Sequence, residues 1–113
     1  MDTLTNVGTS YDATAVSRGL GFRTINMTGV TQIILEIRVN KIGTGTQSWQ
    51  VWNDTDGAEI GVIPDAGATG EKWLSATFNV ALAGTKRLRV RAKSTVSTDD
   101  PILYGADMIE VRP

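Results

Sequence analysis

The clearest pattern in this chain is a strict alternation of apolar and polar residues between positions 72 and 93. The apolar positions share one face: Leu74, Ala76, Phe78 and Val80, then Leu88, Val90 and Ala92. A short Ala-Gly-Thr segment separates the two runs. Because a period of two is typical of half-buried antiparallel strands, the pattern predicts a strand pair joined by a turn, with one face in the core and the other in water.

A second alternating run covers residues 32–40, where every other residue is a large aliphatic one: Ile33, Leu35, Ile37 and Val39. This run is the best candidate for a central strand. Further strands are expected at residues 11–16, 21–25, 47–53, 58–63 and 102–111. Gly29 marks a turn, Asp54-Thr55-Asp56-Gly57 predicts a hairpin turn, and Gly105 marks a bulge or bend. About eight strands with turns every eight to twelve residues predict an all-β fold, a two-layer antiparallel β-sandwich of the jelly-roll type.

The composition fits one globular domain, since the chain has 113 residues, of which 41% are hydrophobic and 20% charged. We expect residues 1–10 to form an N-terminal arm or first strand, and residues 11–113 to form a single β-sandwich domain. The polar N-terminal residues lack the basic start and the continuous apolar core of a secretory signal, so we expect none here, and no window reaches the roughly twenty apolar residues of a membrane span.

The charge and the missing residue types narrow the possible functions. A formal net charge of −1 gives no electrostatic reason to expect nucleic acid or an anionic membrane as partner. The chain has no Cys and no His, so it lacks thiol chemistry, the commonest general base and the commonest transition-metal ligand. We therefore expect a protein that is not an enzyme and that carries no cofactor.

Residues 73–90, W-L-S-A-T-F-N-V-A-L-A-G-T-K-R-L-R-V, resemble the closing strand pair of carbohydrate-binding jelly rolls of the galactose-binding type. In that group a Trp opens a strand, a Leu-Ala-Gly-Thr-like turn follows, and the next strand alternates. The terminal run A-D-M-I-E-V at 106–111 is also similar to a strand of that group. The resemblance implies the fold, and it offers carbohydrate binding as one function.

A second resemblance is to small jelly-roll proteins of tailed-phage particles. It is carried by the stand-alone chain, its Thr/Gly-rich strands, and the stretches K-I-G-T-G-T-Q-S-W at 41–49 and K-S-T-V-S-T-D-D-P at 93–101. It implies a non-enzymatic virion structural protein, a capsid decoration or fibre-like protein. Such a protein would bind the major capsid protein or another virion protein, form a homo-oligomer, and reside on the particle after assembly in the host cytoplasm. This is the leading hypothesis from sequence, and a carbohydrate-binding module with a glycan partner is the alternative.

The tryptophans are the sharpest candidate binding residues. Trp49 and Trp52 fall on opposite faces of one strand, so one of them lies outside the core unless something covers it. An exposed Trp can stack on a sugar or anchor a protein interface, and a rim Trp packed by Arg or Lys stems is the equally weighted structural alternative. We expect a carbohydrate site to use Trp52, the better candidate, or Trp73. The hydrogen-bonding groups beside it would be Gln50, Asn53 and Asp54.

A basic row follows the polar face of one predicted strand: Arg87, Arg89, Arg91 and Lys93. It could meet an acidic surface of a partner. The favoured interpretation is a solvated face that protects the sheet from aggregation, with Glu36 or Glu110 pairing from neighbouring strands.

Two groups of acidic residues are candidate functional sites. Asp54, Asp56 and Glu59 have oxygen atoms at a spacing that superficially suits calcium, but the hairpin turn is the favoured interpretation. A glycosidase needs two carboxylates facing each other across the scissile bond, and the sequence does not place any acids in this way. The acids considered for that role are Asp65, Asp99, Asp100 and Asp107.

Overall fold

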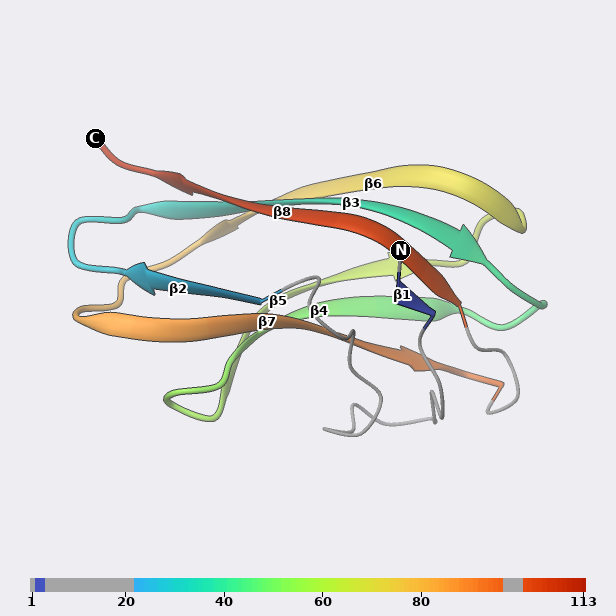
Figure 1. The fold of residues 1–113 in the computed structure, drawn as a ribbon, viewed down its shortest axis with the longest axis horizontal. Helices are drawn as coiled ribbons and strands as arrows, with labels where there is room; N and C mark the ends of the chain where they lie inside the picture. Colours follow the sequence, from blue (N-terminus) through green and yellow to red (C-terminus); the bar gives the residue numbers. More distant parts are fainter. Residues whose placement is uncertain (1, 4–21, 97–100) are drawn as a thin grey trace.

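The computed structural model describes residues 2–3, 22–96 and 101–113, which form eight strands and no helix. No helical segment long and apolar enough to cross a membrane occurs in those residues. The strands make two antiparallel sheets that face each other (Figure 1). Sheet I has the order β1 (Asp2–Thr3), β8 (Ile102–Val111), β3 (Gln32–Lys41), β6 (Gly70–Asn79). Sheet II has the order β2 (Phe22–Asn26), β7 (Thr85–Ser94), β4 (Gln47–Asn53), β5 (Ala58–Asp65). This strand order is that of a jelly roll, so the fold class expected from sequence is confirmed.

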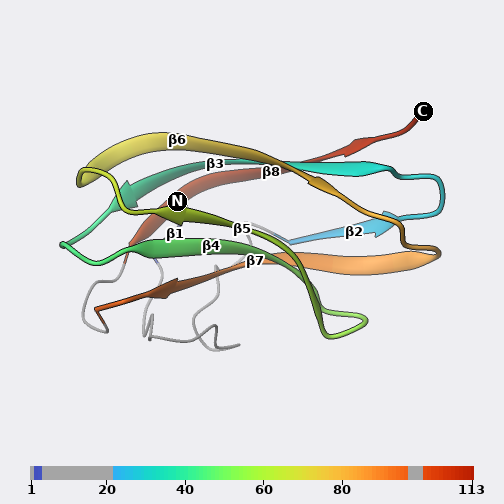
Figure 2. The same cartoon turned by 180° about the vertical axis from the view of Figure 1, so that it is seen from behind.

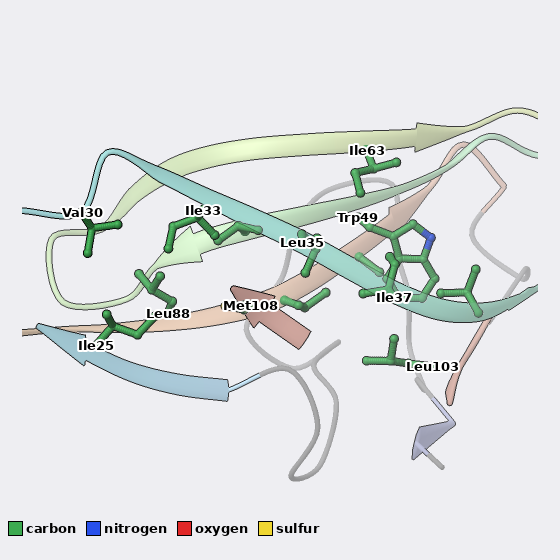
Figure 3. Close-up of a cluster of buried hydrophobic side chains, with 14 of the residues drawn as sticks. Ile25, Val30, Ile33, Leu35, Ile37, Trp49, Ile63, Leu88, Leu103 and Met108 are labelled. Atoms are coloured by element: carbon green, nitrogen blue, oxygen red, sulfur yellow. The ribbon is translucent and has the colours of Figure 1, made fainter. Parts of the chain in front are cut away.

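The core lies between the sheets and follows the alternation of the strands (Figure 3). On β3 the four inward aliphatic side chains are fully buried: Ile33, Leu35, Ile37 and Val39. They face Trp49 and Val51 of β4 and Leu88 of β7, which are also fully buried. Since β3 lies between β8 and β6, its prediction as a central strand is confirmed.

The alternation at residues 72–93 correctly predicted which side chains of β6 and β7 face the core, but the predicted pairing of these two strands is wrong. The inward positions of β6 and β7 are those expected from the alternation. However, β6 pairs with β3 in sheet I, whereas β7 pairs with β2 and β4 in sheet II. Residues 80–84 therefore cross from one sheet to the other instead of closing a hairpin (Figure 2). Gly84, in the predicted turn, has a φ of 81°, in the left-handed region that glycine adopts readily.

Only β4 and β5 are both consecutive in the chain and paired among the described strands. Their connection at residues 54–57 is the predicted hairpin turn, and Gly57 has a positive φ of 65°. The candidate strand at residues 21–25 corresponds to β2, whereas the candidate at residues 11–16 lies outside the described residues. Asp2 and Thr3 pair with β8 as a first strand, and the division at residue 10 stays a prediction.

The predicted irregularity near Gly105 is a β-bulge between β3 and β8. Val39 is opposite Leu103 and Arg38 is opposite Gly105, so Tyr104 is the extra residue. Without the bulge, the alternation that turns Met108 and Ala106 inward would also turn Tyr104 inward. The extra residue instead leaves Leu103 buried and places Tyr104 on the side of Arg38.

Candidate functional site

The most exposed large apolar side chain among the described residues lies on the outer face of sheet I. Trp73 on β6 is 71% exposed, against 41% for Ile109, the next most exposed large hydrophobic residue in the described part. It faces outward because its neighbours Lys72 and Leu74 occupy the inward positions of the strand. Its cross-strand partner on β3 is Arg38. An isolated exposed aliphatic residue is ordinary, whereas an exposed indole is a candidate contact point for a ligand or partner.

Interacting side chains from β3, β6 and β8 lie on the same face as Trp73 and include its cross-strand partner Arg38. The Arg38 guanidinium lies 5.3 Å from the centre of the Tyr104 ring, and its Nη2 donates to Glu71 Oε2 at 2.7 Å. Asn40 Nδ2 donates to the Tyr104 hydroxyl at 3.4 Å. We call these five residues, Trp73, Arg38, Glu71, Tyr104 and Asn40, the Trp73 cluster. The contact with the Tyr104 ring and the ion pair with Glu71 hold the guanidinium in one orientation, and Arg38 is the cross-strand partner of Trp73.

The electrostatics of the Trp73 cluster favour the ionised form of its carboxyl group. Hydrogen bonds from Arg38 and then from Tyr104 hold the pKa of Glu71 below its ordinary value of 4.5. The cluster therefore presents a flat apolar surface, a set of guanidinium donors and a carboxylate acceptor next to one another. This combination can stack on a ring and hydrogen-bond to hydroxyl groups at the edge of that ring.

The other two tryptophans lie elsewhere. Trp49 is fully buried in the core, and Trp52 is half-buried on the outer face of sheet II. The Arg91 guanidinium lies 3.9 Å from the centre of the Trp52 ring and covers it. The expectation that Trp52 is the better candidate for an exposed platform is therefore wrong. Its packing matches the alternative of a rim Trp under an Arg stem.

The polar residues predicted to assist Trp52 are used within the protein. Gln50, 3% exposed, donates to Glu59 Oε1 at 2.9 Å and accepts from Arg91 Nε at 2.8 Å. Asn53, 1% exposed, donates to Asp56 Oδ2 at 2.9 Å. These residues belong to sheet II or the turn that follows β4, so the structure does not bring them together with Trp73. Their role in binding stays a prediction.

The basic row lies on the outer face of β7, as expected, but its partners are different. Arg89 pairs with Asp54 at 2.5 Å, Arg91 bonds to Gln50, and Arg87 and Lys93 also have interaction partners. All four therefore take part in interactions of the protein itself.

The pairing expected from Glu36 and Glu110 is wrong because both residues belong to sheet I. Glu110 instead pairs with Arg23 at 3.3 Å and with Arg112 at 3.1 Å. Arg23 is on β2, so its guanidinium connects the two sheets, and it also donates to the carbonyl of Met108. This contact closes the sandwich between β2 and β8.

The carboxylates of the 54–59 segment stabilise the hairpin. Asp56 pairs with Lys86 at 2.9 Å, and its backbone N–H donates to Asn53 Oδ1. Hydrogen bonds from Lys86 and then from Asn53 lower the pKa of Asp56. Asp54 and Glu59 have the partners described above, Arg89 and Gln50. Across residues 2–3, 22–96 and 101–113, no group of three or more acidic residues is arranged to hold a metal ion.

Of the four acids that are candidates for a glycosidase, Asp65 and Asp107 belong to the described residues, and these two do not lie together. Asp65 is 5% exposed and pairs with Lys72 at 3.0 Å between the sheets, whereas Asp107 is exposed on the outer face of sheet I. Asp99 and Asp100 lie outside the described residues.

A pocket of about 180 Å³ lies beside Asn79 at the opposite end of β6, so Trp73 is part of an open surface and does not line that pocket.

The sequence analysis predicted Trp73 as a candidate binding residue but did not predict the other members of the Trp73 cluster. Arg38, Glu71 and Asn40 become neighbours only through the β3–β6 pairing, in which Arg38 is opposite Trp73 and Asn40 is opposite Glu71. The alternation in β3 and in β6 is visible in the sequence. Pairing these two strands in the correct register would therefore have predicted that Arg38, Glu71 and Asn40 lie near Trp73. Tyr104 reaches the cluster through the bulge, and the only hint of that in the sequence was Gly105.

No family model and no curated protein sequence matches this chain. Three solved structures that match this chain are carbohydrate-binding modules. A module of Cellvibrio mixtus lichenase 5A, solved in complex with cellotriose, is 14% identical with a TM-score of 0.54, over 99% of this chain and 92% of that one. A family 35 module from an environmental isolate is 13% identical with a TM-score of 0.47, over 99% of this chain and 88% of that one. The CBM22-1 xylan-binding domain of Paenibacillus barcinonensis Xyn10C is 12% identical with a TM-score of 0.43, over 100% of this chain and 94% of that one. At such identities the likeness to the Cellvibrio module shows the fold alone, and the other two carry no further argument.

Proposed function

We propose that this protein is a non-catalytic carbohydrate-binding module that holds a glycan on the outer face of sheet I. The observation that carries the proposal is the 71% exposure of the Trp73 indole beside the fixed Arg38–Glu71 pair. An indole left in water forgoes the free energy of burying its apolar surface, about 25 cal/mol per Å². A ligand with a flat apolar face would bury the indole on binding and so gain this free energy.

Each member of the Trp73 cluster has a distinct task in this proposal. The indole stacks on the C–H face of a sugar ring, while Arg38 donates to hydroxyl groups and Glu71 accepts from them. Tyr104 lies against the guanidinium, and Asn40 holds the Tyr104 hydroxyl, so both act as positioning residues. Because these contacts already exist without a ligand, little side-chain entropy is lost on binding.

The fold is compatible with this function, since the similar module of Cellvibrio mixtus lichenase 5A was solved with cellotriose. A fold hosts many functions, so the proposal depends on the site. The comparisons give no support to the virion hypothesis. An exposed Trp could also anchor a protein interface, and a binding experiment separates the two.

The test is affinity electrophoresis through native gels that contain neutral polysaccharides such as mixed-linkage β-glucan, galactomannan and xylan. We expect at least one of them to retard the protein, and Trp73→Ala to weaken that binding by about tenfold or more, the range of a hot-spot residue. Trp52→Phe is the matched control, since it changes a tryptophan on the opposite sheet, and it should bind like the wild type. No retardation by any polysaccharide, or equal retardation of Trp73→Ala, would refute the proposal.

A further inference from the structure

The face that carries Trp73 is acidic. Four charged side chains point outward from β3, β6 and β8: Arg38, Glu36, Glu71 and Asp107. One positive and three negative charges give this face a net charge of −2 within the described residues. The single cation, Arg38, already forms an ion pair with Glu71.

The remaining two carboxylates are directly opposite each other. Glu36 on β3 is the cross-strand partner of Asp107 on β8, both are exposed, and neither forms an ion pair in the part of the chain that the structure describes. Like charges in this arrangement oppose sheet pairing, and any additional anion nearby adds to the repulsion. This pair stands one outward row from Arg38 and Trp73 along the strands.

The distance from this row to the Trp73 cluster is short in electrostatic terms. Outward residues on one strand are two positions apart, about 7 Å. The Debye length at physiological ionic strength is about 8 Å, so a ligand stacked on Trp73 lies within the field of Glu36 and Asp107. A carboxylate or sulfate group on such a ligand meets these two negative charges, because Arg38 and Glu71 neutralise each other in their ion pair.

We infer that the Trp73 face selects uncharged glycans and rejects glycans with carboxylate or sulfate groups on the sugar rings. The inference rests on the proposed function and adds the chemical class of the ligand. In it, Glu36 and Asp107 determine specificity through their charge and without touching the ligand. Removing or reversing either charge should therefore change discrimination more than affinity for a neutral sugar.

A matched pair of ligands tests the inference. Mixed-linkage β-glucan and galactomannan are compared with the same polymers oxidised at C6 from hydroxymethyl to carboxylate, by isothermal titration calorimetry on the full chain. At low ionic strength, about 10 mM, we expect the oxidised form to bind at least tenfold more weakly than its neutral parent. At about 1 M salt, where charges are screened, the gap should narrow to about threefold or less.

Two charge reversals locate the effect. Asp107→Lys should improve binding of the oxidised polymer at low salt by about fivefold, because the new ammonium group also neutralises Glu36. Glu59→Lys makes the same change of charge on sheet II and should leave the ratio of the two affinities as in the wild type. An equal response to both variants would overturn the assignment of specificity to this face. If Asp107→Lys does not fold, the salt dependence of the wild type still decides.

The two proposals fail in different ways. If the oxidised polymer binds as tightly as its parent, and Trp73→Ala abolishes both interactions, the inference is wrong while the carbohydrate-binding function stands. If neither form of either polymer binds, and no gel polysaccharide retards the protein, both are refuted.

Discussion

Glu71 couples the candidate site to pH. Its pKa in the folded protein lies below the ordinary value of 4.5, because the folded state places Arg38 and Tyr104 against the carboxylate. A depressed pKa means that the folded state favours the ionised form. The stabilisation is therefore fully present above about pH 4.5 and is lost as the pH falls through the folded-state pKa.

The expected result is a difference between the wild type and Glu71→Gln that exists at neutral pH and disappears in acid. Urea denaturation between about pH 7 and pH 3 measures it as the free energy of unfolding of each protein. Both groups of the ion pair are about half exposed, so the difference should be small and should shrink further in high salt. Arg38→Met is the matched variant and should remove the same pH-dependent difference. Parallel curves for wild type and Glu71→Gln down to pH 3 would contradict the role given to this pair.

The tryptophans show which features of single residues could be foreseen. The alternation correctly placed Trp49 and Trp52 on opposite faces, because side-chain direction follows from strand period alone. Exposure does not follow from the period. Trp52 is covered because β7 pairs with β4, which places Arg91 opposite Gln50 and beside the indole. That pairing joins residues about forty positions apart, and neither run contains a local signal for it.

At the scale of elements, β5 and β6 close one side of the sandwich, and their contact depends on a missing side chain. Gly61 faces Phe78, and a Cβ at Gly61 would lie 2.1 Å from the Phe78 ring. Gly61→Ala therefore forces the ring to shift, which we expect to destabilise the protein by about 1–3 kcal/mol. Urea denaturation should show a lower midpoint with an unchanged m-value.

Two variants make the Gly61 prediction specific. Gly105→Ala changes a strand glycine whose Cβ would meet nothing within 4 Å, and it should alter stability by no more than about 0.5 kcal/mol. In Phe78→Leu the smaller side chain leaves room, so adding Gly61→Ala should cost less than it does in the wild type. Strict additivity of the two substitutions would show that the ring is not the cause.

The connections between strands mark the limit of the sequence-based prediction. Asp-Gly in the 54–57 turn predicted a hairpin correctly, because the turn chemistry is local: Asn53 and Asp56 bond to each other and Gly57 takes the positive φ. The Ala-Gly-Thr segment before β7 gave a similar signal but crosses between sheets. A short connection with a glycine suits both geometries, and the choice depends on which strands β6 and β7 find as partners.

The free edges of the sheets also have a physical explanation that the pattern did not reveal. Lys72 interrupts the inward apolar face of edge strand β6, and its ammonium group reaches buried Asp65 and the carbonyl of Ala68. On the facing edge, β5 contains Pro64. An inward charge and a proline are both devices that discourage edge-to-edge pairing with another chain. They explain how a ten-residue edge strand next to an exposed Trp can avoid aggregation.

At the scale of the whole molecule, the topology makes folding depend on contacts between distant parts of the chain. Asp2 and Thr3 pair with β8 near the other end, β3 pairs with β8, and β2 pairs with β7. The β4–β5 hairpin is the one pairing between consecutive strands in the described residues. Loop closure must precede most of the sheet, so stopped-flow refolding should take milliseconds to seconds, as in other β-sandwiches.

The same reasoning predicts which contacts form first. The β4–β5 hairpin is local, so Ile63→Ala in β5 should mainly slow folding, with a kinetic φ-value of about 0.5–0.8. Leu103 is equally part of the core, but β8 joins sheet I only through long-range pairs, so Leu103→Ala should mainly accelerate unfolding, with a φ-value of about 0–0.3. Chevron plots for both variants measure these values. The reverse order would mean that the distant sheet I pairs nucleate the fold, and that the hairpin is stable only after the two sheets have met.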